Sequence, residues 1–263
     1  MIRNMIHIVL ISALLATTLV LLGFATKSNQ LLPCETVVVY VDQRCGNKFI
    51  EPSDIEKNVR ERIGDRLGKP LEQGSLNMVK QLVEGNPYVA KAAIYRTIDG
   101  DLHIRIRQHE PLVRVINNKN QSYYISQTGK LLPVSRNYSA RVMVATGNIQ
   151  QGYSQTVDLL SPADPETITK SEQQLRDLFQ LSRIIHNDPF WKSLIDQMYI
   201  TNNGQFELTP MNGAHTIEFG GLEEAEEKFQ KLELFYRVGL HEVGWNYYTR
   251  INLKYDKQIV CSK

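Results

Sequence analysis

The side chains best suited to metal binding do not form a recognised motif in this sequence. Six histidines stand at positions 7, 103, 109, 186, 215 and 241, and no two of them are four residues apart with a glutamate between them. That spacing would place two zinc ligands on one face of a helix. No Cys-x-x-Cys pair occurs either. The sequence therefore predicts no metal site and no bound cofactor.

Two histidine–glutamate pairs, His109-Glu110 and His241-Glu242, contain the groups that general-base catalysis needs. We interpret both as exposed surface pairs, because a charged residue beside a histidine is common. The sequence has no Gly-x-Ser-x-Gly, Gly-x-Gly-x-x-Gly, Ser-x-x-Lys or Walker motif. We therefore predict no catalytic residues, and we interpret Gly220-Gly221 as a turn between a strand and a helix.

The cysteines and tryptophans are interpreted as structural residues. Three cysteines are too few for a disulfide scaffold, and their odd number leaves at least one thiol unpaired. An extended segment between Cys34 and Cys45 would hold them beyond the roughly 7 Å limit for a disulfide, so we expect no bond there. We expect Cys261 to be a small apolar filler, and Trp191 and Trp245 to be core anchors.

The composition favours a folded, near-neutral chain. Of the 263 residues, 42% are hydrophobic and 22% are charged, which excludes collagen-like, low-complexity and wholly disordered chains. Lys and Arg number 30 and Asp and Glu 28, giving a net charge of +2. This charge creates no field that would attract nucleic acid. The length suits one or two domains.

One segment departs from this average, because no charged residue occurs from Asn4 to Thr26. A helix rises about 1.5 Å per residue and needs about 20 residues to cross a bilayer core, and Ile6 to Ala25 supplies them. The segment is either a retained anchor or a signal peptide cleaved after the small residues Gly23 and Ala25. We favour a transmembrane helix over 6–26, because the uncharged core exceeds the roughly 7 to 15 residues usual in a signal peptide.

The residues after a linker at 27–35 predict a small α+β module. Val37 to Val41 is expected to be a strand. Tyr88 to Tyr95 and Leu102 to Arg107 are expected to pair as a hairpin through the turn Asp99-Gly100. The last of these strands alternates apolar and polar residues, so one of its faces should be buried and the other exposed to water.

Two short amphipathic helices lie between these strands in the sequence. Ser53 and Glu56 have the spacing of a capping box at the start of the first helix. Its apolar residues recur every four positions, at Ile55, Val59 and Ile63. The second helix is expected to begin at Ser75 and to bury Leu76, Val79, Leu82 and Val83. Strand, helix, helix, strand and strand together predict a three-stranded sheet with two helices on one face.

The rest of the chain predicts a larger, mostly antiparallel β domain with two long helices. Strands are expected at Leu112–Ile116, Tyr123–Ser126, Leu131–Val134, Val142–Ala145, Leu194–Ile200, Phe206–Thr209, Thr216–Phe219, Tyr247–Leu253 and Gln258–Cys261. Helical spacing predicts one helix at Ile168–Ile185 and another from Leu222 to Tyr236. In the second helix, Glu224 to Lys228 and Glu227 to Lys231 have the spacing of i,i+4 ion pairs.

A strand at the end of a chain tends to lie at the edge of a sheet. Its unpaired amides and carbonyls can accept an extended segment of a partner, which gives main-chain affinity with side-chain specificity. Alternatively, Lys254, Lys257 and Lys263 protect that edge against aggregation. Both interpretations stay open from the sequence.

The order of these segments resembles the FtsQ/DivIB family of bacterial cell-division proteins over nearly the whole chain. The resemblance rests on loose motifs whose order and spacing are together specific: Gly68–Leu71, Pro87-Tyr88-Val89-Ala90-Lys91-Ala92, Leu102-His103-Ile104-Arg105-Ile106, Pro111-Leu112-Val113, Tyr124 with Gly129 and Leu132-Pro133, and Arg250-Ile251-Asn252-Leu253-Lys254-Tyr255. It implies a cytoplasmic tail at 1–5, the span at 6–26, a POTRA-like domain at 36–111 and a β domain at 112–263.

The resemblance also implies the function. It implies a non-catalytic scaffold in the inner membrane at the division septum, with its C-terminal domain in the periplasm. Its partner would be a small bitopic coiled-coil protein of the FtsB/FtsL kind, and through it the septal peptidoglycan synthases. The contact carried over to this sequence consists of Lys254, Tyr255, Lys257, Gln258, Ile259 and Val260.

The chain departs from the family pattern at four places. Gln108-His109 stands where the family often has Glu-Arg, and Ser126 where an aspartate is usual. Asn252 and Lys254 stand where aspartate and arginine are common. Two other functions remain alternatives: a different POTRA-containing protein of envelope assembly, or a secreted envelope hydrolase with an unrecognised site.

Overall fold

The computed structural model describes residues 7, 10–20, 32–43, 46–162 and 168–263. Of the predicted span, residues 7 and 10–20 are helical, and the leucine, isoleucine and valine side chains of 10–20 are exposed. The other residues of the predicted span, and Cys45, lie outside the described part of the chain. No helix in that part is long and apolar enough to cross a membrane.

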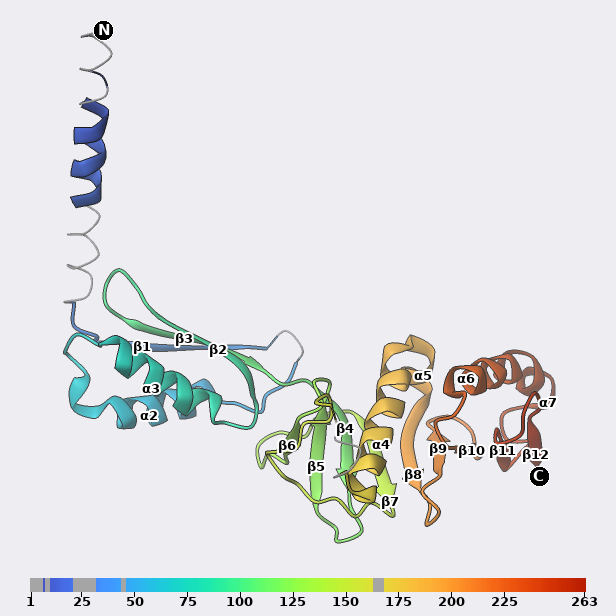
Figure 1. Cartoon of the computed structure of the whole chain (residues 1–263). Coiled ribbons are helices and arrows are strands. Elements are labelled where there is room, and N and C mark those ends of the chain that lie inside the picture. Colours follow the sequence, from blue (N-terminus) through green and yellow to red (C-terminus); the bar gives the residue numbers. More distant parts are fainter. Residues whose placement is uncertain (1–6, 8–9, 21–31, 44–45, 163–167) are drawn as a thin grey trace. The chain divides into compact units, whose positions relative to one another are not determined.

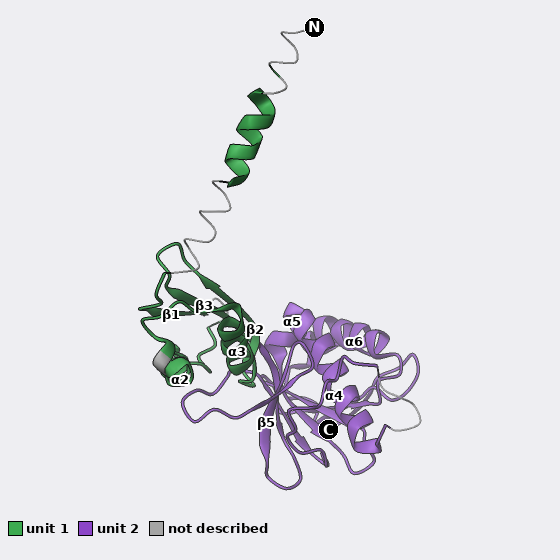
Figure 2. Cartoon of the chain, turned by 60° about the vertical axis from the view of Figure 1, so that its left-hand side comes forward, with its two compact units in different colours: residues 1–108 green, residues 109–263 purple. Residues whose placement is uncertain are grey.

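The chain divides into two compact units, Met1–Gln108 and His109–Lys263 (Figure 2). The first unit contains β1 (Val37–Asp42), α2 (Pro52–Ile63), a 3-10 turn (Gly64–Arg66), α3 (Gln73–Glu84), β2 (Val89–Arg96) and β3 (Leu102–Gln108). Its described strands form a sheet, here called the small sheet, in the order β1-β3-β2. β3 is parallel to β1 and antiparallel to β2. The predicted order of strands and helices is confirmed.

The two helices cover one face of the small sheet (Figure 1). The four-residue repeat of α2 is buried as predicted, together with Val79 and Val83 of α3 and the alternating residues Leu102, Ile104 and Ile106 of β3. Each helix thus buries one stripe of apolar residues, and β3 buries every second residue. Leu82 is exposed, contrary to expectation.

Both predicted helix starts are wrong by about two residues. α2 begins at Pro52 after the N-cap residue Glu51, with no side-chain cap, so Ser53 does not form a capping box. Proline suits the first helical position because its φ is already helical and its missing amide hydrogen would have no partner there. α3 begins at Gln73, and the buried Ser75 hydroxyl accepts a hydrogen bond from Arg66 Nη1 at 3.0 Å.

The second unit is built on a long mixed sheet, here called the large sheet. Its described strands follow the order β12-β11-β10-β9-β8-β7-β4-β5-β6. Their bounds are β4 (Pro111–Ile116), β5 (Ser122–Ser126), β6 (Leu131–Pro133), β7 (Met143–Gly147), β8 (Ile195–Ile200), β9 (Phe206–Pro210), β10 (Thr216–Gly220), β11 (Arg250–Asn252) and β12 (Val260–Ser262). Among the described strand pairs of the large sheet, only β4–β7, β7–β8 and β10–β11 are parallel, so the prediction of a mostly antiparallel sheet is confirmed.

Helices pack on one face of the large sheet (Figure 1). They are α4 (Lys170–Asn187), α5 (Pro189–Leu194), α6 (Ala225–Leu234), a π-helical turn (Phe235–Gly239) and α7 (Leu240–Val243). Trp191 of α5 is buried beside Phe229 of α6, with ring centroids 5.0 Å apart. The core role of Trp191 is therefore confirmed. Trp245 is 42% exposed, so its predicted core role is wrong.

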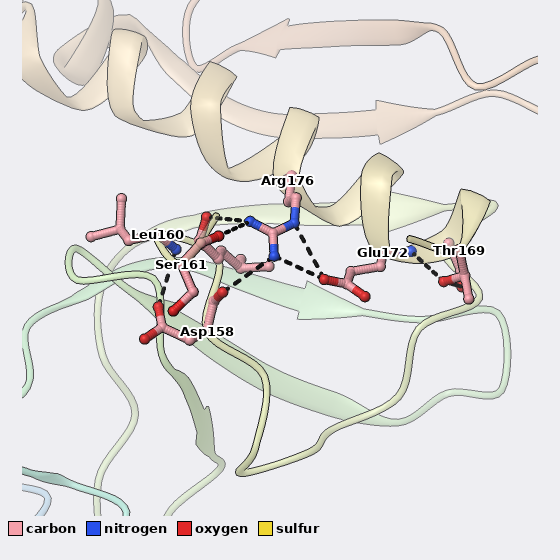
Figure 3. Close-up of polar contacts among 8 residues, drawn as sticks. Asp158, Leu160, Ser161, Thr169, Glu172 and Arg176 are labelled. Atoms are coloured by element: carbon pink, nitrogen blue, oxygen red, sulfur yellow. Dashed lines mark hydrogen bonds and ion pairs between the residues drawn. The ribbon is translucent and has the colours of Figure 1, made fainter. Parts of the chain in front are cut away.

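One side-chain cap, from Thr169, and the side chain of Arg176 stabilise the start of α4 (Figure 3). The Thr169 hydroxyl accepts the Glu172 amide at 3.2 Å. Arg176 Nη1 donates to the carbonyls of Leu159 and Ser161 at 2.9 and 2.8 Å, and Nη2 lies 2.9 Å from Glu172 Oε1. The guanidinium fork thus fastens the segment before the helix to its second turn.

The predicted ion pairs on α6 are replaced by contacts with the backbone. Lys228 is buried, donates to the Gly221 carbonyl at 2.9 Å and lies 5.1 Å from the ring centroid of Phe219. Lys231 Nζ donates to the Tyr255 carbonyl at 3.1 Å. The glycine pair does form the predicted strand-to-helix turn, with Gly220 at φ 82°.

Candidate protein-binding edge

The last strand of the chain forms one edge of the large sheet. β12 pairs on one side with β11 in antiparallel register, with Asn252 opposite Val260. β11 is in turn parallel to β10, with Glu218 opposite Asn252. The described chain places no further strand beyond β12. The prediction of a terminal edge strand is confirmed.

The two faces of this edge differ. Val260, Asn252 and Glu218 occupy paired positions, so their side chains lie on the same face of the sheet, which we call the open face. Cys261 and Ile251 point to the opposite face and pack against the hydrophobic core. Burial raises the pKa of the Cys261 thiol, in agreement with its predicted role as an apolar filler.

A compact charge network organises the open face beside the edge. Glu218 is only 14% exposed and lies 2.6 Å from Arg250 Nη1 and 3.0 Å from Lys254 Nζ. Asn252 Nδ2 donates to the same carboxylate at 2.8 Å. Hydrogen bonds from Lys254 and Arg250 lower the pKa of the Glu218 carboxyl. Lys254, predicted to contact a partner, is therefore already engaged within the chain.

The connection between β11 and β12 presents the other predicted contact residues. Tyr255, Lys257 and Gln258 are exposed, and Tyr255 is fixed through its carbonyl, which accepts from Lys231. Val260 is 41% exposed. Ile259 is half-buried and packs against the core, so it is poorly placed for a direct contact.

Sequence reasoning missed two tyrosines beside this edge. Tyr247 is 43% exposed, and Lys263 Nζ lies 4.3 Å from its ring centroid. The Tyr248 ring packs edge-on against Tyr247 at 4.9 Å. The Thr249 amide donates to the Ser262 carbonyl at 2.8 Å, which holds this segment beside β12. The two tyrosines were assigned to a strand, but β11 begins only at Arg250.

The described histidines have different environments. His109 is half-buried, with Nδ1 3.1 Å from the Thr128 hydroxyl, whereas His241 is exposed. The predicted exposure therefore holds for His241 alone. His186 Nε2 lies 3.2 Å from Gln127 Nε2. Across the described residues, no group of three or more potential ligands could hold a metal ion.

Two family models match the chain. Residues 110–262, more than half of the chain, match the family described as FtsQ/DivIB, C-terminal related. Residues 32–107 match the POTRA-like domain. No curated protein matches the sequence.

Proposed function

Because the chain belongs to the FtsQ/DivIB C-terminal-related family, we propose that it is a non-catalytic scaffold of bacterial cell division. The scaffold recruits the septal peptidoglycan synthesis machinery through its domains outside the cytoplasm. The POTRA-like match over the first unit supports this assignment, since it reproduces the domain order expected for such a protein.

The proposed topology has a single pass through the inner membrane. A tail at 1–5 is cytoplasmic, 6–26 spans the bilayer, and a POTRA-like domain (36–111) and a β domain (112–263) lie in the periplasm. The long uncharged stretch of the sequence supports the span. We further propose that the protein is enriched at the division septum.

The proposed partner is a small bitopic coiled-coil protein of the FtsB/FtsL kind, and it binds by adding a strand to β12. The observation that supports this most directly is the free outer side of β12 in the described sheet. Main-chain hydrogen bonds supply affinity in this mode, and neighbouring side chains supply selectivity. The exposed Tyr255, Lys257 and Gln258 precede β12, Val260 begins it, and all four suit that second role.

Depletion of the protein combined with imaging of a tagged chain tests the function. We expect filamentous cells without septa, and septal enrichment of the tagged protein before depletion. Normal division after complete loss, in cells without a second homologous gene, would refute the proposal. Uniform distribution in the envelope would also speak against it.

A further inference from the structure

We propose that the first unit inserts Ile98, at the tip of the β2–β3 hairpin, among the lipid headgroups of the membrane. The inference rests on the membrane anchor of the proposed function and adds a lipid-contacting surface to it. Ile98 is 77% exposed, more than any other large hydrophobic residue in the described chain. Val38, Tyr40 and Tyr95 are also exposed on the first unit, and a group of exposed apolar side chains can mark a membrane contact where a single one does not.

The hairpin tip lies beside the point at which the chain enters the unit. A Cβ added to Gly100, whose φ is 94°, would lie 2.6 Å from the Pro33 carbonyl oxygen and 3.0 Å from the Leu32 Cβ. Arg96 Nη2 donates to the Leu32 carbonyl at 2.7 Å. The start of β1 and the start of β3 are also paired, with Val37 opposite Leu102 (Figure 1). These contacts fix the chain entry next to the tip.

The length of the connection limits how far the tip can lie from the membrane. The proposed span ends at residue 26, and Leu32 is the first of the described residues after it that the unit holds. Six residue steps cover at most roughly 20 Å in a fully extended chain. The interfacial region adds roughly 5 to 8 Å outside the hydrocarbon core on each side. A retained anchor therefore keeps Ile98 within reach of the headgroups.

The face of the small sheet that the helices leave uncovered changes in polarity along the strands. The cross-strand register places its side chains in three rows: Val38, His103 and Tyr95; then Tyr40, Arg105 and Ala93; then Asp42, Arg107 and Lys91. The first row is nearest the hairpin tip and has no permanently charged residue. The last row has three. The polarity thus rises with distance from the chain entry.

The side chains of the first two rows suit a membrane interface. Tyr95 and His103 lie with ring centroids 5.6 Å apart, and the Arg105 guanidinium lies 5.9 Å from the ring centroid of Tyr40. Tyrosine is enriched at headgroup level because its ring is apolar and its hydroxyl is polar. Arginine can pack its stem on apolar surface and keep its charge in water.

The charges at the chain entry indicate which lipids are involved. Glu35, Asp99 and Asp101 lie at this end together with the cations Lys69 and Arg96, so acidic and basic groups nearly balance. Because this end has no surplus of basic residues, it has no strong electrostatic attraction to anionic lipids. The contact is therefore apolar, and a zwitterionic phosphatidylcholine surface is sufficient for it.

The test uses the full chain in phosphatidylcholine vesicles with one fluorescent probe per protein. Cysteine replaces Ile98, Tyr95, Ala93 or Lys91 in a background carrying Cys45→Ser and Cys261→Ser, while the buried Cys34 is kept. Lipids with a spin label on the headgroup quench a nearby probe. We expect at least twofold quenching at 98 and a steady decrease through 95 and 93 to 91. Met211→Cys, at an exposed turn of the second unit, is the matched control.

The possible results distinguish failure of the proposed lipid contact from failure of the proposed membrane anchor. Release of the chain by alkaline carbonate would refute both the anchor and the inference. Retention with no more quenching at 98 than at 211 would refute the inference alone. Probes shielded from aqueous iodide but not quenched by lipid would indicate a second copy on this face, and would also refute it. Ile98→Asp should halve the quenching at 95 without changing the circular dichroism spectrum.

Discussion

Arg250 Nη1 on β11 lies 2.6 Å from Glu218 Oε1 on β10. The two strands are parallel and connected by more than 25 residues that include α6 and α7. A charge-assisted bond between them therefore fixes a pairing that no tight turn defines. The same carboxylate holds Lys254, so one acidic side chain binds a residue at the start of β11 and another just beyond its end.

Glu218→Gln is expected to lower the free energy of unfolding of the second unit by about 1 kcal/mol at pH 7, since two partly screened ion pairs are lost. Chemical denaturation measures this. The matched control is Glu207→Gln, which lies directly opposite Glu218 on β9 and is a like charge. Glu207→Gln should lower the free energy of unfolding less than Glu218→Gln does, or should even raise it. Equal losses in both variants would contradict the role of Glu218.

The same carboxylate gives a pH dependence with a defined sign. The pKa of Glu218 is lowered in the folded state, so its contribution is complete above its unfolded value near 4.3. That contribution disappears as the pH falls through the lower folded value. Below pH 4.5 the parent protein should therefore lose stability faster than Glu218→Gln. Parallel curves for the two proteins would contradict the shift.

His215 is expected to destabilise the fold at mildly acidic pH. It is buried, its Nε2 lies 2.5 Å from the Tyr236 hydroxyl, and burial lowers its pKa. Below about pH 6.5 the unfolded chain binds a proton that the folded chain does not, so stability falls with pH by up to about 1.4 kcal/mol per unit. Thermal unfolding from pH 7.5 to 5.5 should show a shallower slope for His215→Gln than for the exposed control His241→Gln.

Gln108 explains one departure from the family pattern. Its Oε1 accepts the amides of Phe49 and Ile50, each at 3.0 Å, and its Nε2 donates to the Asn47 carbonyl at 3.0 Å. A glutamate would keep the two accepted bonds but lose the donor. The glutamine therefore matches a loop that offers one acceptor and two donors.

Gln108→Ala is expected to destabilise the first unit by about 2 to 3 kcal/mol, because buried backbone groups lose their partners. Gln108→Glu should destabilise the unit less, because the carboxylate still accepts the amides of Phe49 and Ile50. Amide hydrogen exchange at residues 49 and 50 measures the effect locally, and Arg107→Ala, on the exposed face of β3, is the control. Unchanged protection in Gln108→Ala would show that water or another group replaces the side chain.

Arg176 is expected to protect the segment Asp158–Ser161 from proteolysis. Its guanidinium donates to the carbonyls of Asp158, Leu159 and Ser161 and twice to the Glu172 carboxylate, which is more bonds than the three N–H donors of a lysine can make (Figure 3). Arg176→Lys should therefore speed limited proteolysis in this segment several-fold, with a loss of about 1 kcal/mol in stability. Arg183→Lys, on the exposed side of the same helix, should leave the cleavage rate unchanged. Equal rates in both variants would contradict the role of Arg176.

The parts of the fold that depend on local periodicity were predicted from the sequence. The alternation of β3 and the four-residue repeat of α2 both follow from apolar spacing, which every core-facing element must satisfy. The edge position of β12 followed from its place at the end of the chain. The domain order and the family followed from the resemblance, and the family matches confirm the family.

The parts that depend on distant contacts were not predicted. Lys228 is four residues from Glu224, yet its amine turns to the Gly221 carbonyl and the Phe219 ring, because the preceding turn brings them close. α5 was missed because Asp188 ends α4 and also caps the next helix by accepting the Phe190 and Trp191 amides. Lys254 was assigned to a partner by the family resemblance, whereas its ion pair with Glu218 depends on the pairing of β10 with β11, which brings the two residues together from distant parts of the chain.

Val260 gives the sharpest test of the proposed partner edge. It is exposed on the open face of β12, so side chains of a strand added at this edge would pack against it. Val260→Asp should weaken co-purification of the FtsB/FtsL-type partner at least tenfold, because an apolar contact at the centre of an interface is replaced by a charge that must be desolvated. Val260→Pro should have a similar effect, since proline removes a main-chain donor from the strand.

The matched control for Val260 lies at the opposite edge of the large sheet. Val134 is also exposed and directly follows β6, so Val134→Asp introduces the same charge beside the other edge strand. It should leave partner binding unchanged. Lys254→Ala should weaken binding less than Val260→Asp does, because Lys254 is held by Glu218. Unchanged binding in both Val260 variants, with unfolding curves like the parent's, would refute strand addition at β12, whereas equal weakening by Val134→Asp would place the partner elsewhere on the unit.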